Sequence, residues 1–434
     1  MNHMMRVRRR GWTFLAALGL LWPAAAHAQV TVTLDEAIQR AMDRSPAMAQ
    51  QEQAVGNASS AKLQALGTFI PNVSASSSGS LRSAQRFDQA TDRIVTGSAD
   101  SYSAGLSGSI TLFDGGRMFA SYDGAKADYS AALARRENQR NQVTLQTKNL
   151  FFAALRQADL LEVARQRVRQ AEESLTMVRT RTQVGTATMS DSLRARLELV
   201  NARQAQLTAE TATRAARFAL GRQIGESQPV APVPPENLEP VPLTMSDEEI
   251  LQLAEAGSPS VVAAEESARS AGKDVSIAKA QYLPSISFSS GYNWANQAAS
   301  LGGGTTSWSL GLRASYPIFN GFAREGAVDR AQWTQRVARL QEDDARLAAR
   351  QQADGALQDL RSAEQAIAIA QEAQAVAQED LRVVGERYRV GVATILELVT
   401  SQISAVQAGV NVVTARYDYV LARAQLEAVL GRGL

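Results

Sequence analysis

The chain has 434 residues, of which 45 are Lys or Arg and 43 are Asp or Glu, so its formal net charge is +2. It contains no cysteine, and its two histidines, His3 and His27, lie within the first 28 residues. Beyond residue 28 the chain therefore offers no thiol for catalysis or lipidation and no imidazole for acid–base catalysis or metal binding. It also lacks a phosphate-binding glycine loop and a paired-acid motif. These absences predict a protein that is not an enzyme and that has no metal site and no cofactor.

Residues 1–28 have the features of a secretory signal peptide. Four arginines between Arg6 and Arg10 form a basic region, residues 12–22 form a short apolar core, and Ala26-His27-Ala28 matches a cleavage site. The apolar core is too short for a good membrane-spanning helix. We expect the mature chain to begin at Gln29. Because the signal arginines account for the small positive charge, we expect no nucleic-acid partner.

The rest of the chain is a sequence repeat. Landmarks of the first half recur in the same order 213 or 206 positions later. They are Ser45-Pro46 and Ser258-Pro259, Phe69-Ile70-Pro71 and Tyr282-Leu283-Pro284, Leu112-Phe113-Asp114-Gly115 and Ile318-Phe319-Asn320-Gly321, and Val184-Gly185 and Val390-Gly391. Such order and spacing predict a duplicated unit that cannot bury its surfaces alone. We expect a first repeat at 29–225 and a second at 246–434, joined by a proline-rich, semi-rigid connector at 226–245.

Each repeat has the same predicted elements. A short helix ends at the Ser-Pro pair, and a helix of about twenty residues follows. The first repeat then has a β-hairpin at about 72–113 and long helices at about 117–183 and 188–222. The second has a hairpin at about 285–319 and long helices at about 322–389 and 394–430. Residues 117–183 contain no proline and one glycine, Gly124, and would form a helix roughly 100 Å long.

Apolar and polar residues alternate in the segments expected to form strands. Four apolar residues on one side of the last segment are candidates to face lipid: Trp308, Leu310, Leu312 and Tyr316. Ser309, Gly311, Arg313 and Ser315 fall on the other side, so the segment has one apolar and one polar face. A hairpin on a soluble core is the alternative. The small polar residues and the aromatics near the strand ends favour lipid.

The long return helices carry apolar residues at three- and four-residue spacing. In the second repeat the row is Leu396, Val399, Ile403, Val406, Val410, Val413, Tyr417, Val420 and Ala424. In the first repeat it is Leu193, Leu197, Val200, Gln204, Leu207, Thr211, Arg214 and Phe218. This spacing predicts coiled-coil seams. An antiparallel coiled coil without a channel fits the same pattern.

Strands in lipid would require several chains. Four strands leave open sheet edges, which hydrocarbon does not tolerate, and the smallest outer-membrane barrels have about eight strands. Two chains would close a barrel filled with side chains, whereas three would supply twelve strands and leave a lumen. The small polar residues favour three chains. We therefore expect a mixed α and β membrane protein with a trimeric 12-stranded β-barrel.

These features together resemble the TolC family of outer-membrane efflux and secretion channels, across essentially the whole chain after the signal. The resemblance rests on the duplicated plan, on the Phe-(Asp/Asn)-Gly hairpin exits and on two Val-Gly turns. The second turn runs from Tyr388 to Glu397, and the first runs from Thr182 to Asp191 without the tyrosine. The resemblance implies that an α-helical barrel continues the β-barrel across the periplasm.

The resemblance also implies a location and partners. The protein would be a homotrimer in the outer membrane of a Gram-negative bacterium, in contact with outer-membrane lipid and not lipidated. It would be a passive conduit that docks with a periplasmic adaptor (membrane fusion) protein and, through it, with an inner-membrane RND or ABC transporter. Drugs, metals and proteins all remain open as cargo.

The resemblance places adaptor docking at the two turns. The residues concerned are Val184, Gly185 and Thr186 in the first turn and Val390, Gly391 and Val392 in the second. Each glycine permits a left-handed turn and close approach of a partner backbone. The simpler interpretation is that the glycines only end the helices.

Residues near the turns are candidates for an aperture or gate. The resemblance implies that acids at Asp191 and Glu397 line the opening, where carboxylates would favour cations. The alternative is that they interact with helix N-termini. Tyr388 matches a latch tyrosine, and we expect it to hydrogen-bond to Asp191. Replacing either residue, as in Tyr388→Phe or Asp191→Ala, would then raise the resting conductance.

Two positions depart from the family pattern. Ala393 stands where some members have a latch arginine, for which Arg389 is a candidate substitute. Thr400 stands where the same members have a second acid. The resting gate is therefore expected to be looser or to use other contacts.

A periplasmic coiled-coil scaffold or adaptor without a pore is the alternative function. An adaptor usually has one helical hairpin flanked by small β-domains. Two long hairpins and four amphipathic strands favour the channel.

Overall fold

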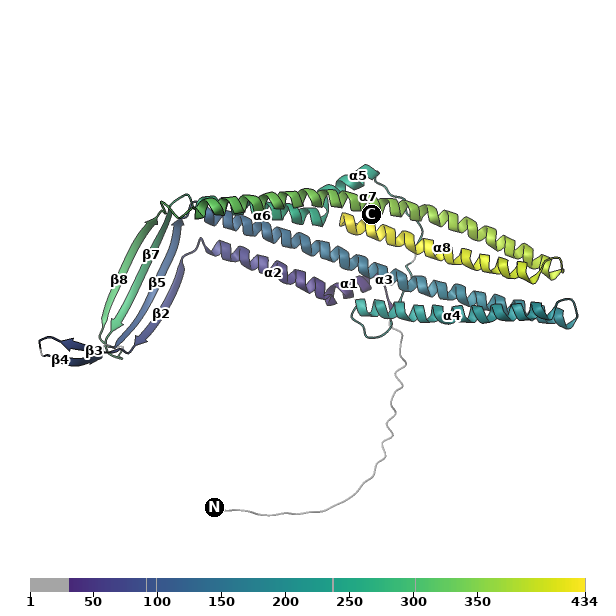
Figure 1. Cartoon of the computed structure of the whole chain (residues 1–434), viewed down its shortest axis with the longest axis horizontal. Helices are drawn as coiled ribbons and strands as arrows, with labels where there is room; N and C mark the ends of the chain where they lie inside the picture. The colour runs from purple at the N-terminus through teal and green to yellow at the C-terminus, as the bar shows by residue number, and fades with distance from the viewer. Residues whose placement is uncertain (1–30, 91, 99, 236–237, 301, 434) are drawn as a thin grey trace, which may run out of the picture.

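The computed structural model describes residues 31–433 apart from 91, 99, 236–237 and 301. The expected signal peptide and the start at Gln29 lie outside these residues. The molecule is elongated, with a four-stranded sheet at one end and two helical hairpin turns at the other (Figure 1). Among the described residues, no helix has both the length and the apolar character needed to cross a membrane.

The two repeats contain matching elements. The first comprises β1 (Thr31–Val32), α1 (Leu34–Arg44), α2 (Pro46–Gly67), β2 (Asn72–Ser80), β3 (Ser83–Asp88), β4 (Arg93–Ser98), β5 (Ser101–Phe113), α3 (Arg117–Gln183) and α4 (Met189–Gln223). The connector carries β6 (Ala231–Pro232). The second comprises α5 (Asp247–Gly257), α6 (Pro259–Ala280), β7 (Ser285–Asn296), β8 (Thr305–Ser315), α7 (Ala323–Arg389) and α8 (Ile395–Leu430).

The Ser-Pro pairs mark the same junction in both repeats. Ser45 precedes α2, and its side chain accepts a hydrogen bond from the Met48 amide while Pro46 occupies the first turn. Ser258 and Pro259 begin α6 in the same way, although the Ser258 side chain does not cap the helix. Serine and proline suit these positions because the first helical amides have no partner within the helix.

The sheet joins the two repeats. Its strand order is β2-β5-β7-β8, and all neighbours are antiparallel. Register pairs Leu106 with Tyr292 and Tyr292 with Trp308, so the apolar side chains form a continuous row across three strands. Strands β2 and β8 are the two edges, and each leaves one row of backbone groups without a partner within this sheet.

The first hairpin is more elaborate than expected. Between β2 and β5, strands β3 and β4 form a separate antiparallel pair in which Phe87 lies opposite Ile94. Figure 1 shows this pair pointing away from the four-stranded sheet. The second hairpin is shorter than expected, because β8 ends at Ser315 rather than near 319. Pro317 follows and cannot donate to a strand ladder.

The helices form two tiers. Helices α3 and α7 each have 67 residues, which at the usual rise corresponds to about 100 Å. In Figure 1, α2 runs in line with α4 and α6 in line with α8. The first junction is tied by Arg44, whose Nη1 donates to the Gly225 carbonyl at 2.8 Å. At the second, Gly431 lies against Pro259, where an added Cβ would approach a ring carbon at 3.0 Å.

The connector is attached to both repeats. Strand β6 pairs in parallel with β1. Farther along, the Tyr419 hydroxyl of α8 accepts from the Val241 amide at 2.9 Å and donates to the Val241 carbonyl at 3.1 Å. The proline-rich segment is therefore attached at Ala231–Pro232 and at Val241.

The predicted seams on α4 and α8 are partly wrong. On α4 the buried residues include Ala195, Leu199 and Ala202, whereas Leu193 and Leu197 are exposed. The first turns of α8 likewise bury Ile395 and Leu398 but expose Leu396 and Ile403. The small and branched residues of the neighbouring row pack within the chain, because they allow the helices to approach closely. The larger row of α4 remains uncovered in a single chain.

Candidate functional site at the helical tip

The two Val-Gly turns have the same backbone structure. Gly185 and Gly391 have φ angles of 79° and 86°, which is left-handed geometry that favours glycine. In the first turn, the amides of Thr186 and Ala187 donate to the carbonyl of Arg181. In the second, the amides of Val392 and Ala393 donate to the carbonyl of Arg387. The sequence repeat at an offset of 206 is thus a structural repeat at the tip.

The tip presents apolar side chains on its surface. Val184, Val390 and Val392 are exposed, as are Thr186 and both turn glycines. Exposed valines at the end of a helical hairpin are free to contact a partner, and the adjacent glycines let a partner backbone come close. These are the residues that the sequence suggested for docking.

The acids after the turns cap helices in this structure. Thr188 and Asp191 form a capping box at the start of α4, in which the Thr188 hydroxyl donates to Asp191 Oδ2 at 2.8 Å and accepts from the Asp191 amide at 3.2 Å. Thr394 and Glu397 do the same at the start of α8, with the hydroxyl 3.1 Å from Glu397 Oε1. The acids also complement the positive ends of the helix dipoles.

The expected hydrogen bond between Tyr388 and Asp191 is not formed. Tyr388 is only 4% exposed, and its hydroxyl has no hydrogen-bond partner among the described residues. Burial raises the pKa of this phenol, and the nearby Asp191 carboxylate raises it further, while Arg181 opposes the shift. The tyrosine is therefore neutral at physiological pH. The Asp191 carboxylate instead accepts from the amide and the hydroxyl of Thr188, both through Oδ2.

Arg181 is a tip residue that the sequence did not point to. It lies in the last turn of α3, and its Nη1 donates to the main-chain carbonyl of Tyr388. Its guanidinium carbon is 4.8 Å from the centre of the Tyr388 ring. Its other terminal nitrogen lies 3.4 Å from where a Cβ at Gly391 would be. One arginine thus joins the first helical hairpin to the turn of the second.

The other two gate candidates do not form such a link. Arg389 pairs with Glu386 on its own helix, with 3.4 Å between Nη1 and Oε1, and both side chains are largely exposed. Within the chain it does not take the place of the latch arginine, because its ion-pair partner among the described residues lies on its own helix. Thr400 is exposed on α8.

Polar pairs above the tip hold each hairpin together. In the first hairpin, Arg167 on α3 donates twice to Glu198 Oε1 on α4, at 3.0 and 2.7 Å. In the second, the Ser401 hydroxyl on α8 donates to Asp380 on α7 at 2.5 Å. Glu198 and Ser401 are buried, so separating the helices of either hairpin would expose an unpaired polar group.

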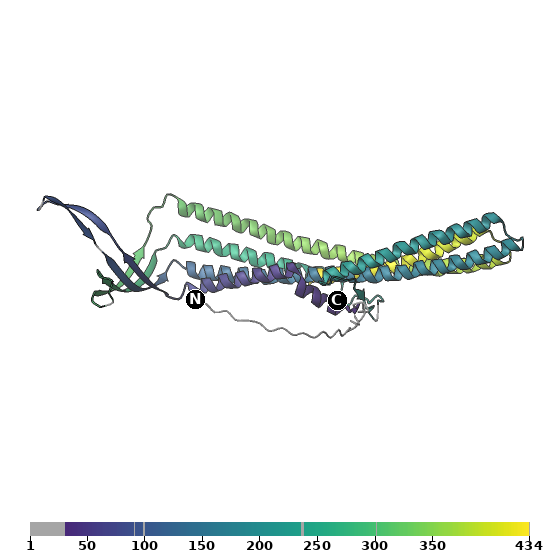
Figure 2. The ribbon, with the colours of Figure 1, turned by 90° about the horizontal axis from the view of Figure 1, so that it is seen from below.

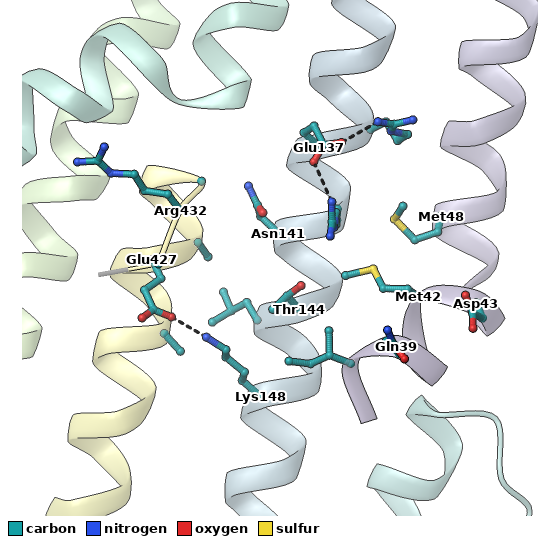
Figure 3. A pocket seen from close by; sticks show the side chains of 18 of the residues that line it. Gln39, Met42, Asp43, Met48, Glu137, Asn141, Thr144, Lys148, Glu427 and Arg432 are labelled. Carbon is teal, nitrogen blue, oxygen red and sulfur yellow. Dashed lines mark hydrogen bonds and ion pairs between the residues drawn. The ribbon is translucent and has the colours of Figure 1, made fainter. Parts of the chain in front are cut away.

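An open groove lies at the middle of the molecule. This open groove of about 950 Å³ has α3 as its floor and is bounded by α1, α2 and the end of α8 (Figure 3). Lys148 and Glu427 form an ion pair of 2.6 Å across it, and Glu137 contacts two arginines of α3. The described residues contain no cluster of His, Cys, Asp and Glu that could hold a metal ion. The charges of the groove are mostly paired with one another.

The apolar face of the sheet is exposed over its whole width. Trp308, Leu310, Leu312 and Tyr316 are exposed, Trp308 by 74%. In Figure 2 the sheet forms a curved layer beyond the ends of the helices. No other part of the described chain covers this row of side chains, so either water or an apolar phase must contact it.

Comparison with known proteins identifies the family. A profile described as outer membrane efflux protein matches residues 37–226 and 250–432. Protein CyaE of Bordetella pertussis is 28% identical over 360 residues, which cover 80% of this chain and 73% of CyaE. Outer membrane protein TolC of Vibrio cholerae is 24% identical over 339 residues, or 77% of each chain.

Solved structures share the fold. The outer membrane protein VceC from Vibrio cholerae superposes with a TM-score of 0.78 at 18% identity, covering 92% of this chain and 96% of VceC. CusC superposes with a TM-score of 0.80 at 19% identity, covering 92% of each chain. The profile matches two segments that correspond to the two repeats and together span most of the chain. The chain therefore belongs to the outer membrane efflux protein family, a family of outer-membrane efflux and secretion channels.

Proposed function

We propose that three copies of this chain assemble into one channel. Each copy contributes the four strands β2, β5, β7 and β8, and β8 of one copy pairs with β2 of the next to close a barrel of twelve strands. Closure satisfies the backbone groups on both sheet edges, which is a requirement in hydrocarbon. Members of the TolC family are trimeric, which supports this number of copies.

Exposed rows on two helices support the same assembly. Helix α4 exposes Leu193, Leu197, Val200 and Leu207. Helix α7 exposes Trp333, Val337, Leu340, Leu347, Ile369 and Val376. The two helices lie at opposite sides of the chain, since α4 packs mainly on α3 and α7 mainly on α6 and α8. We infer that α7 of one copy covers α4 and α2 of its neighbour, which removes both rows from water.

The barrel would lie in the outer membrane of a Gram-negative bacterium. Trp308, Leu310, Leu312 and Tyr316 would face lipid, and the helices would extend into the periplasm as a second barrel. We propose no lipid anchor, because the chain contains no cysteine. The aligned apolar rows of three strands support this orientation.

The tip would be the docking site for a periplasmic adaptor protein. We infer that adaptor hairpins contact the turns at Val184, Gly185 and Thr186 and at Val390, Gly391 and Val392. The exposed valines and the matching backbone of the turns support six similar docking positions in a trimer. The adaptor would connect the channel with an inner-membrane RND or ABC transporter, and the channel itself would be a passive conduit.

Aperture control would reside at the same end. Asp191 and Glu397 would line the opening in addition to capping their helices, because a capping carboxylate retains a free face toward solvent. Arg181 with Tyr388 would hold the two hairpins of one copy together. Arg389 and Thr400, which are exposed, would contribute to the surface of the aperture, and the buried Tyr388 would support that surface from within the chain.

The single observation that carries the proposal is a sheet with two open edges and an exposed apolar face. The deciding experiment is the native mass of the mature protein in mild detergent, together with its fractionation. We expect a trimer that fractionates with the outer membrane. A stable monomer, or a dimer that needs no detergent, would overturn the closed barrel and leave a periplasmic scaffold as the better account.

A further inference from the structure

Arg313 is the single charged residue in the four strands of the sheet, every position of which the structure describes. The other residues of β2, β5, β7 and β8 are apolar side chains, glycines and uncharged polar side chains. Arg313 lies two positions before the end of β8 and therefore at the end of the sheet that adjoins the long helices.

The pleat places Arg313 on the polar face. It follows Leu312, and successive side chains of a strand point to opposite faces. Register aligns Arg313 with Ser287 and Ser287 with Thr111, so its row across the sheet otherwise carries only hydroxyls. The next positions along the same face of β8 are Gly311 and Ser315. A long cation here extends past small neighbours, toward the lumen of the proposed barrel.

No carboxylate neutralises this cation in the described chain. The Arg313 side chain makes neither a hydrogen bond nor an ion pair with any described residue. The strand that would adjoin β8 in the next copy is β2, whose sequence from Asn72 to Ser80 contains no acid. Two charged groups that follow the helix-side ends of β8 and β5 have other partners: Arg324 donates to the carbonyls of Pro317 and Ile318. Asp114, which is buried, caps α3 and pairs with Arg117.

We propose that the three Arg313 side chains of the assembled channel form a cationic ring at the base of the barrel, which binds anionic solutes that carry carboxylate or phosphate groups. The inference rests on the proposed trimer. Rings of arginine or lysine favour anions in pores, and a lumen with low-dielectric walls strengthens the field of fixed charges. The planar guanidinium suits carboxylate and phosphate in particular, because it donates two parallel hydrogen bonds.

The ring would give the barrel a preference for anions, whereas the acids at the tip would favour cations. Asp191 and Glu397 would present negative charge at the periplasmic opening, whereas Arg313 presents positive charge where cargo enters the barrel. An anionic group on the cargo would therefore meet its favourable site only after it has passed the tip. The class of cargo that this arrangement assists is one with accessible carboxylate or phosphate groups.

The test is block of single channels in planar bilayers by inorganic tripolyphosphate. The probe is added to the extracellular side, from which it reaches the base of the barrel without passing the tip. We expect block from this side at low salt, weaker block at high salt, and an apparent affinity that falls about tenfold in Arg313→Ser, since three unpaired charges are lost. Arg313→Lys should retain most of the block because it retains the charge.

A gain-of-charge variant provides the matched control. Ser107 is the residue 206 positions before Arg313. It lies in β5 on the face of the sheet that carries Arg313, and it pairs with Gly291. Ser107→Arg adds a second ring among small residues and should strengthen the block severalfold. Equal block in the original chain, Arg313→Ser and Ser107→Arg would overturn the ring while the channel stands. Absence of conductance from the original chain would instead contradict the proposed channel itself.

Discussion

At the scale of single residues, Arg181 has the most consequential contact at the tip. It donates to a carbonyl in the last turn of α7, where the helix dipole is negative and the terminal carbonyls lack intrahelical partners. Its guanidinium also lies over the Tyr388 ring, which adds a cation–π attraction. The contact is partly shielded from water and adds a polar link between two hairpins that also share an apolar cluster, which includes Val178, Leu199 and Ile395. Arg181 is therefore the residue whose loss should most loosen the tip.

We expect Arg181→Ala to raise the resting conductance of the channel in planar bilayers. Loss of a charge-assisted hydrogen bond costs about 1.5–3 kcal/mol, enough to raise the population of an open tip tenfold or more. Arg181→Lys should give an intermediate conductance, because lysine keeps the charge without the planar stacking. Tyr388→Phe is the control, since it keeps the ring and the carbonyl and removes a hydroxyl that is unpaired within the described chain. Unchanged conductance in Arg181→Ala would contradict the role of this contact.

The predictability of these residues differs for a physical reason. The glycines of the turns, and the interaction of Asp191 and Glu397 with helix N-termini as an alternative, could be identified from the sequence, because these roles depend on local backbone geometry. The partners of Tyr388 could not, because Arg181 lies on another hairpin and is 207 positions away. The interpretation of Asp191 as a partner of Tyr388 was wrong, since Asp191 Oδ2 accepts from Thr188 and the buried Tyr388 hydroxyl has no partner among the described residues.

At the scale of elements, strands were more predictable than helix faces. A strand has two faces, so alternation alone assigned Leu310 and Arg313 to opposite sides. A helix such as α4 has overlapping apolar rows, and tertiary packing decides which row is buried. Leu199 is buried, whereas Leu197 is exposed. The short polar strands β3 and β4 were missed because they lack an apolar row and resemble a loop in composition.

The apolar face of β8 leads to a prediction about membrane assembly. We expect Leu310→Asp and Leu312→Asp each to prevent accumulation of trimers in the outer membrane, because a charged side chain facing hydrocarbon destabilises a barrel. Fractionation and native electrophoresis would measure the effect. Ser307→Asp is the matched control on the opposite face of the same strand, and it should assemble normally. Normal assembly of both leucine variants would show that this face does not contact lipid.

At the scale of the whole molecule, the repeat relates contacts within one chain to contacts between neighbouring chains. A contact between the two repeats of one chain predicts an equivalent contact between copies. Arg181 fills the space beside Gly391, whereas the equivalent space beside Gly185 has no atom within 4 Å of an added Cβ. The repeat counterpart of Arg181 is Arg387, which is exposed. The counterpart of Tyr388 is Thr182. In a ring of six similar hairpins, Arg387 of each copy would thus donate to the Thr182 carbonyl of its neighbour, beside Gly185.

This contact between copies can be tested by cross-linking, because the chain contains no cysteine. We expect the double variant Thr182→Cys with Arg387→Cys to give dimers and trimers with a short bismaleimide, since both positions would lie at one junction between copies. Thr182→Cys with Arg382→Cys, which places the second thiol more than one helical turn away, should cross-link less. Arg387→Ala should also raise the resting conductance, as is expected for Arg181→Ala. The first would remove the contact between neighbouring copies, and the second would remove the contact between the two hairpins of one copy. Trimeric channels that yield only monomers with both cysteine pairs would show that the tip does not continue the repeat around the ring.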